Sequence, residues 1–168
     1  MAHAILVGLP GVGKSTVGHA LASVLNLTFL DLDVVIAQQA GEETAASVIE
    51  VRGLEAFRDL EARCLLDVLT ESAIVATGGG VVERVDNQQA LRQHGKVLWL
   101  DCADDIIIPR VTGSHRPLLA SDPRASLAML RHSREVLYKE ISTARLDAAG
   151  NLADVVDSAV AAMSGWSL

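Results

Sequence analysis

Residues 4–16, Ala-Ile-Leu-Val-Gly-Leu-Pro-Gly-Val-Gly-Lys-Ser-Thr, decide how the rest of the sequence is interpreted. The apolar residues 4–7 predict a buried strand, and the glycines that follow predict a tight loop. From Lys14 to Leu25 the sequence predicts a helix. A buried strand that leads through a glycine-rich loop into a helix is typical of the start of an α/β fold.

The loop between this strand and helix matches the pattern G-x-x-x-x-G-K-[ST] from Gly8 to Ser15. Its backbone N–H groups can turn inward around a phosphate, to which Lys14 and the helix dipole add positive charge. The Ser15 hydroxyl is suited to bind Mg²⁺. A plain glycine-rich turn is the alternative, but the complete context favours a site for a nucleoside triphosphate with Mg²⁺. The residues expected to bind ATP here are Gly11, Val12, Gly13, Lys14, Ser15 and Thr16.

The rest of the chain alternates between short apolar segments and helical patterns. Further strands are predicted at 27–30, 73–77, 97–100 and 144–146, and helices at 33–39, 45–50, 54–69, 86–94, 124–140 and after Asn151. This alternation predicts one α/β domain over residues 1–168, with a parallel sheet covered on both faces. Ligands of such folds bind at the carboxyl ends of the strands. The polar stretch 112–123 follows no strong period and is predicted to be a mobile lid.

Composition and charge exclude several other classes of protein. The chain has 14 Lys and Arg against 21 Asp and Glu, a net charge of −7, and only 3% aromatic residues. Proteins that bind nucleic acid or anionic membranes usually have the opposite charge excess. No apolar run is long enough for a membrane helix, and the two cysteines lack metal-type spacing. We therefore expect a cytoplasmic monomer that binds neither nucleic acid nor membrane.

The sequence lacks the N-K-x-D segment of GTPases, and its short length and predicted lid favour a small kinase. Asp31 and Asp33 come at the end of the second predicted strand. In an extended chain they point to opposite faces, so one carboxylate can support Mg²⁺ while the other faces the phosphoryl acceptor. Alternatively, Asp33 is only the N-cap of the next helix and Asp31 is solvated.

Two arginines on predicted helices are candidates for binding an anionic acceptor. Arg58 lies at the edge of an apolar stripe, and Glu61 can hold its guanidinium; an ordinary surface ion pair is the alternative. Arg134 falls within an apolar stripe formed by Leu127, Leu130, Leu137 and Ile141. A buried guanidinium needs an anionic partner, which is either a protein carboxylate or a carboxylate of the ligand.

Two further segments offer groups that can contact a ligand. Gly78, Gly79 and Gly80 follow a strand and can present backbone N–H groups, although a plain turn has the same composition. Arg116 lies in the predicted lid, from which it can reach the transferring phosphoryl group. A solvated loop arginine is the alternative there.

The order and spacing of these motifs resemble the shikimate kinases over nearly the whole chain. The resemblance rests on residues 8–16, 31–33, Gly53-x-x-x-Phe57-Arg58-x-x-Glu61, 77–80, 116–119 and Arg134-x-x-Leu137-Tyr138. It implies a three-layer P-loop fold with a five-stranded parallel sheet. The implied reaction is ATP-dependent phosphorylation of the shikimate 3-hydroxyl, a step toward chorismate and the aromatic amino acids.

The resemblance also implies roles for individual residues. Asp33 would contact the shikimate hydroxyls, Arg116 the ATP phosphates and Ser15 the Mg²⁺ ion, with Asp31 close by. Catalysis is expected from Asp33, Lys14 and Arg116, and substrate binding from Asp33, Arg58, Gly78, Gly79, Gly80 and Arg134. The chain departs from the family pattern at Leu54 and Val136 and has no arginine at 148–152, so Arg110 is the candidate beside the adenine.

Two other functions are compatible with the motifs. One is a kinase of similar shape for another polyol acid, such as gluconate. The other is a non-catalytic sensor that retains the fold, as in regulators fused to DNA-binding domains. Because Met1 lies so close to the first predicted strand, no preceding helix-turn-helix segment is expected, which argues against the sensor.

Overall fold

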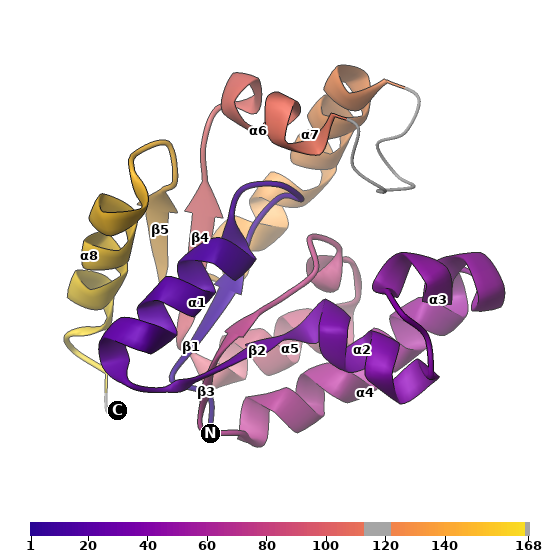
Figure 1. The fold of residues 1–168 in the computed structure, drawn as a ribbon, viewed down its shortest axis with the longest axis horizontal. Coiled ribbons are helices and arrows are strands. Elements are labelled where there is room, and N and C mark those ends of the chain that lie inside the picture. Colours follow the sequence, from indigo (N-terminus) through magenta and orange to yellow (C-terminus); the bar gives the residue numbers. More distant parts are fainter. Residues whose placement is uncertain (113–121, 167–168) are drawn as a thin grey trace.

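A five-stranded sheet forms the centre of the computed structural model, which describes residues 1–112 and 122–166. All strands are parallel and follow the order β2-β3-β1-β4-β5 (Figure 1). The strands are β1 (Ala4–Val7), β2 (Thr28–Asp31), β3 (Ala73–Ala76), β4 (Val97–Asp101) and β5 (Ala144–Asp147). The predicted α/β fold with a five-stranded parallel sheet is therefore confirmed.

The central strand β1 places the glycine-rich loop in the middle of the sheet. Ile5 is in register with Val75 on one side and Val97 on the other. Every residue of β1, β3 and β4 is buried, while the edge strands β2 and β5 are partly exposed. A strand with both faces covered needs apolar residues at every position, which explains the continuous apolar runs in the sequence.

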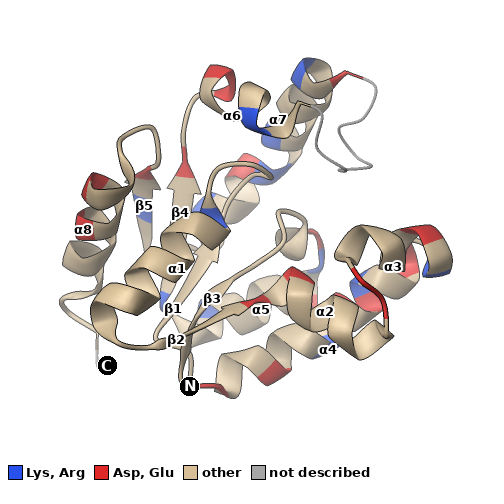
Figure 2. Ribbon diagram, in the orientation of Figure 1, with Lys and Arg blue, Asp and Glu red and all other residues tan. Residues whose placement is uncertain are grey.

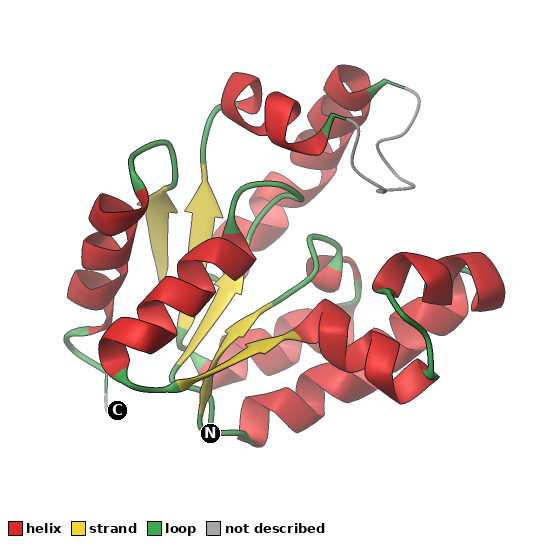
Figure 3. Cartoon of the chain, in the orientation of Figure 1, coloured by secondary structure: helices red, strands yellow, loops and turns green. Residues whose placement is uncertain are grey.

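Helices cover both faces of the sheet (Figure 3). Helices α1 (Lys14–Leu25) and α8 (Leu152–Met163) pack on one face. Helices α4 (Leu54–Thr70), α5 (Val85–His94) and α7 (Pro123–Ile141) pack on the other. The apolar stripe predicted for α4 is buried, because its side chains face the neighbouring elements.

The remaining helices lie around the carboxyl edge of the sheet. Helices α2 (Leu32–Ala40) and α3 (Ala45–Arg52) pack against α4, and α6 (Asp104–Val111) packs against α7. A short 3₁₀ helix, η1 (Val81–Glu83), follows β3. The sequence analysis predicted neither η1 nor α6. Helix α6 contains Pro109 and a run of three isoleucines, both unfavourable for helix formation.

Most of the predicted lid, residues 113–121 with Arg116, lies outside the described residues. Among the helices of residues 1–112 and 122–166, none combines the length and the apolar character that crossing a membrane requires.

The packing of α1 on the sheet gives a test of the core. Leu21 is fully buried, whereas Val24 on the same helix is 65% exposed. We expect Leu21→Ala to lower the free energy of unfolding by about 2–5 kcal/mol, because it leaves a cavity. The matched variant Val24→Ala should change it by less than about 0.5 kcal/mol. Urea denaturation measures both values, and equal losses would contradict this packing.

Candidate active site

The loop between β1 and α1 is held closed by its own lysine. The Lys14 Nζ donates hydrogen bonds to the carbonyl oxygens of Gly8 at 2.9 Å and Leu9 at 3.0 Å. Gly8 has a φ of +146°, and a Cβ there would lie 2.3 Å from the Leu100 carbonyl oxygen. Only glycine fits this approach to β4. The buried ammonium thus lies inside the loop, where a phosphate would bind.

Ser15 and Asp31 connect this loop to the end of β2. The Ser15 hydroxyl donates to Asp31 Oδ2 at 2.6 Å, and Asp31 Oδ1 accepts a hydrogen bond from the Asp33 backbone N–H at 3.0 Å. Asp31 is therefore the N-cap of α2. A hydroxyl beside a carboxylate is an oxygen-rich pair of the kind that suits Mg²⁺.

This geometry corrects the interpretation of Asp31 and Asp33. The chain is not extended through both residues, because α2 begins at Leu32 and Asp33 lies in its first turn. The alternative that Asp33 caps the helix is also wrong, since Asp31 is the cap. Strand β2 extends one residue further than predicted, to Asp31, so the helix begins immediately after the strand.

One cavity of about 510 Å³ brings the nucleotide and acceptor candidates together at the carboxyl edge of the sheet. In Figure 2 the ribbon at the start of α1, which lies at this edge, has the blue of Lys and Arg. The predicted site residues that line the cavity are Gly11, Val12, Gly13, Lys14, Ser15, Thr16, Asp31, Asp33, Gly78, Gly79 and Arg110. Its far wall is formed by Ala148, Gly150 and Leu152. Arg110 also donates to the Val12 carbonyl at 3.3 Å, across the loop.

The three glycines after β3 each allow a different group to come close. A Cβ on Gly78 would lie 2.8 Å from Asp33 Oδ1, and one on Gly79 would lie 2.7 Å from the Pro10 ring. A Cβ on Gly80 would fall 1.9 Å from a nitrogen of the Arg58 guanidinium. A turn alone does not require glycine at all three positions. A side chain at any of them would make the carboxylate, the loop or the guanidinium shift from its present position.

The two candidate arginines meet at a carboxylate beyond this cavity. Arg58 donates to Glu61 at 2.8 Å and to Glu83 at 2.6 Å. Arg134 donates to Glu83 Oε1 from Nε at 3.0 Å and from a terminal nitrogen at 2.5 Å. The arginine side chains are only 9% and 2% exposed, so the surface ion pair considered for Arg58 is wrong. Arg134 is buried as its apolar stripe predicted, and in this structure its partner is a protein carboxylate.

Glu61 is a buried carboxyl group between the arginines and Asp33. Its side chain is fully buried, and its Oε1 atom has no hydrogen-bond partner among the described residues. Burial raises the pKa of Glu61 from 4.5 to about 7, and the nearby Arg58 offsets only part of this shift. The charges of Asp33 and Glu83 raise the pKa further. The acceptor side therefore contains a proton site that titrates near neutral pH.

Tyr138 ties α7 to the glycine segment. Its hydroxyl donates to the Gly79 carbonyl at 2.5 Å, and its ring stacks on Trp99 of β4 with centroids 6.0 Å apart. Burial raises the pKa of Tyr138, so the phenol remains a donor throughout the neutral range. Arg134 lies one helical turn before Tyr138, so this contact fixes how α7 presents the arginine.

The sequence analysis missed Glu83 as a member of this cluster. Its position depends on η1 and on arginines from α4 and α7, which are far apart in the chain. The predicted burial of Arg134 indicated that an anionic group lies next to it. It did not indicate which residue or ligand supplies that group. Arg116 is not among the described residues, so its expected contact with the ATP phosphates stays a prediction.

The comparisons with known proteins agree on one family. A family model described as shikimate kinase matches residues 10–164. The shikimate kinase of Chromobacterium violaceum is 40% identical over 145 residues, which cover 84% of this chain and 78% of the relative. The structure of shikimate kinase from Acinetobacter baumannii in complex with shikimate is 32% identical, with a TM-score of 0.88 over 93% of this chain and 89% of that chain. A gluconokinase from Sinorhizobium meliloti shares only the fold, at 19% identity and a TM-score of 0.63, over 96% of this chain and 91% of that chain.

The raised pKa of Glu61 predicts how stability depends on pH. Between pH 4.5 and about 7 the folded protein keeps a proton that the unfolded chain has lost. Stability therefore falls as the pH rises through this interval. In Glu61→Gln this loss, on the order of 3 kcal/mol, should be absent.

Urea denaturation of both proteins at pH 5 and pH 8 measures the difference. Wild type should lose more stability than Glu61→Gln between these two pH values. Glu140→Gln is the matched control, because Glu140 is an exposed partner of Arg92 and should follow wild type. Parallel pH curves for wild type and Glu61→Gln would contradict the assignment.

Proposed function

The chain belongs to the shikimate kinase family, and we propose that it transfers the γ-phosphoryl group of ATP to the 3-hydroxyl of shikimate. The products are shikimate 3-phosphate and ADP. The observation that carries this proposal is the cavity that joins the glycine-rich loop to Asp33, Gly78 and Gly79. Phosphoryl transfer depends mainly on positioning and charge stabilisation, and both require the donor and acceptor to share one space.

The nucleotide is proposed to bind along the loop from Gly11 to Thr16. Loop N–H groups and the Lys14 ammonium would hold the phosphates, with Arg110 at the same cavity. Ser15 and Asp31 supply the oxygen atoms that fit Mg²⁺, with the hydroxyl as a ligand and the carboxylate close by. When bound, the ion would neutralise phosphate charge during the transfer. Arg116 is proposed to reach the same phosphates.

The acceptor is proposed to bind between Asp33 and the arginine pair. Arg58 and Arg134 would bind its carboxylate, since guanidinium groups match a carboxylate with two parallel hydrogen bonds. Backbone groups of residues 78–80 would contact the ring substituents. The Asp33 carboxylate lines the cavity that holds the loop, so it can orient the 3-hydroxyl and accept its proton.

The setting of the enzyme is part of the proposal. We expect residues 1–168 to act as one domain and as a monomer. Cys64 and Cys102 are both buried free thiols, as is usual in the reducing cytoplasm.

A coupled assay of ADP release tests the proposed function. Wild type should release ADP with shikimate and Mg·ATP, and far more slowly with gluconate or without an acceptor. Product analysis should place the phosphate on the 3-hydroxyl. Equal rates with and without shikimate would contradict the proposal and favour the sensor, and a preference for gluconate would identify the other kinase.

Replacing Asp33 tests its role as proton acceptor. We expect Asp33→Asn to lower kcat by about 10²–10⁴-fold, because the amide is a poor base. The melting temperature should stay near that of wild type, since the helix is capped by Asp31. Asp59→Asn removes an exposed charge from α4 and serves as the matched control. A near-normal kcat for Asp33→Asn would remove this residue from catalysis.

Replacing Arg134 tests carboxylate binding. Arg134→Ala should raise KM for shikimate roughly 10- to 100-fold, as expected for the loss of a charged hydrogen bond in a desolvated site. ATP binding should hardly change. Arg134→Lys should restore only part of the affinity, because the planar guanidinium is lost. An equal loss of ATP and shikimate affinity in both variants would indicate a structural role instead.

A further inference from the structure

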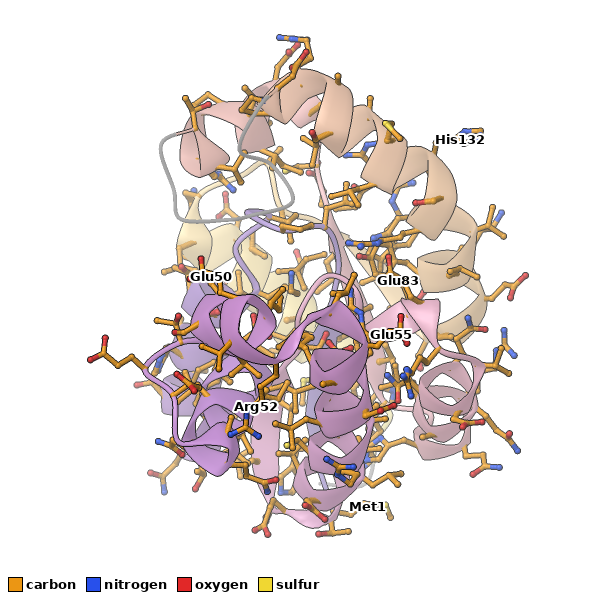
Figure 4. All side chains as sticks on the ribbon, turned by 90° about the vertical axis from the view of Figure 1, so that its right-hand side faces the viewer. Met1, Glu50, Arg52, Glu55, Glu83 and His132 are labelled. Atoms are coloured by element: carbon orange, nitrogen blue, oxygen red, sulfur yellow. The ribbon has the colours of Figure 1, made fainter. Side chains whose placement is uncertain are left out.

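Glu83 occupies the position between the two arginines that an incoming carboxylate would need. One carboxylate oxygen accepts from Arg58, and the other accepts two hydrogen bonds from Arg134. Figure 4 labels Glu83 near helix α7, with Glu55 further along the same side of the molecule. Both guanidinium groups therefore have a protein carboxylate as a partner in this structure.

The members of this cluster differ in how easily they can move. The side chains of Arg58 and Arg134 are 9% and 2% exposed, whereas that of Glu83 is 39% exposed. Glu83 can turn into water, where its charge is solvated. The arginines are enclosed by packing, and Arg58 remains paired with Glu61 if Glu83 leaves. Glu83 is thus the displaceable partner.

Occupied hydrogen-bond donors also favour displacement over joint binding. Both carboxylate oxygens of Glu83 accept from the arginines, Oε2 from Arg58 and Oε1 twice from Arg134. A second carboxylate bound by the same nitrogens would lie against Glu83, and like charges repel each other. Exchange of one carboxylate for another leaves the charge of the cluster unchanged.

We propose that Glu83 is an internal stand-in for the carboxylate of the acceptor, and that shikimate binds by displacing it from Arg58 and Arg134. This inference rests on the proposed function. Only molecules whose arginines are free of Glu83 can then bind the acceptor carboxylate. The smaller this fraction is, the weaker the apparent affinity for the acceptor. It acts on the carboxylate end of the acceptor and not on the reacting hydroxyl. Its effect therefore falls on the KM for shikimate, and kcat is set elsewhere.

The experiment compares Glu83→Gln with wild type and with Glu55→Gln. Glutamine keeps the size of the side chain but removes the competing charge. Glu55 is a 90% exposed carboxylate that pairs with Arg84 at 3.6 Å, so Glu55→Gln controls for the general loss of one negative charge. The dissociation constant of shikimate is measured by calorimetry, KM and kcat by ADP release, and folding by circular dichroism.

We expect Glu83→Gln to lower both Kd and KM for shikimate by about three- to tenfold, as removal of a competing state does. The affinity for shikimate methyl ester, which has no carboxylate charge, should increase much less in Glu83→Gln. A rise in KM would overturn displacement and show that Glu83 instead holds the arginines in position. Equal Kd and KM values for Glu83→Gln, Glu55→Gln and wild type would also overturn the displacement of Glu83.

The same measurements separate this proposal from the proposed function. If wild type turns over shikimate but Glu83→Gln binds it no better, only the displacement of Glu83 fails. If wild type does not turn over shikimate, the proposed function fails. Benzoate then serves as a plain carboxylate probe in calorimetry. Tighter benzoate binding by Glu83→Gln supports displacement, and unchanged binding overturns it.

Discussion

The lack of side chains at residues 78–80 is the constraint on which the candidate active site depends. Each glycine allows one close approach, by Asp33, by Pro10 of the glycine-rich loop or by Arg58. The nucleotide loop and the acceptor residues come from different parts of the chain, and these three positions leave room for their close approach. An added Cβ at Gly79 would press on Pro10 and so on the loop, whereas at Gly78 or Gly80 it would make the Asp33 or Arg58 side chain shift.

Buried charge forms the second constraint, because an isolated ion is costly in a low-dielectric interior. The cluster around Arg58 and Arg134 satisfies it with two protein carboxylates, one fully buried and one partly exposed. The buried partner, Glu61, stabilises the arrangement on the inner side. The exposed partner, Glu83, pairs with both arginines on the outer side.

The fold could be predicted from the sequence because its signals are local. Apolar runs at 4–7 and 97–100 identified buried strands, and the helical pattern at 54–69, with its apolar stripe, identified an amphipathic helix. Helix α6 could not be predicted in this way. Its proline and isoleucines disfavour a helix, and its contacts with α7 are available only in the folded protein.

The site could be predicted only in part, for the same reason. The phosphate-binding loop is contiguous and has its own pattern, whereas the acceptor residues are dispersed. The position of Arg134 indicated a buried cation but not its partner. The relation between Asp31 and Asp33 depends on where α2 begins. The expected extended geometry was wrong, because α2 begins at Leu32, one residue earlier than predicted.

The stacked pair of Trp99 and Tyr138 provides an intrinsic optical signal from the acceptor site. Trp99 is buried in β4 and stacks on the Tyr138 ring. The Tyr138 hydroxyl in turn donates to the Gly79 carbonyl. The chain has only two tryptophans, and the other, Trp166, follows α8. A Trp166→Phe protein would therefore carry a single tryptophan, which can be excited selectively over Tyr138. Its emission would follow rearrangements of the glycine segment and α7 in real time, without any attached label.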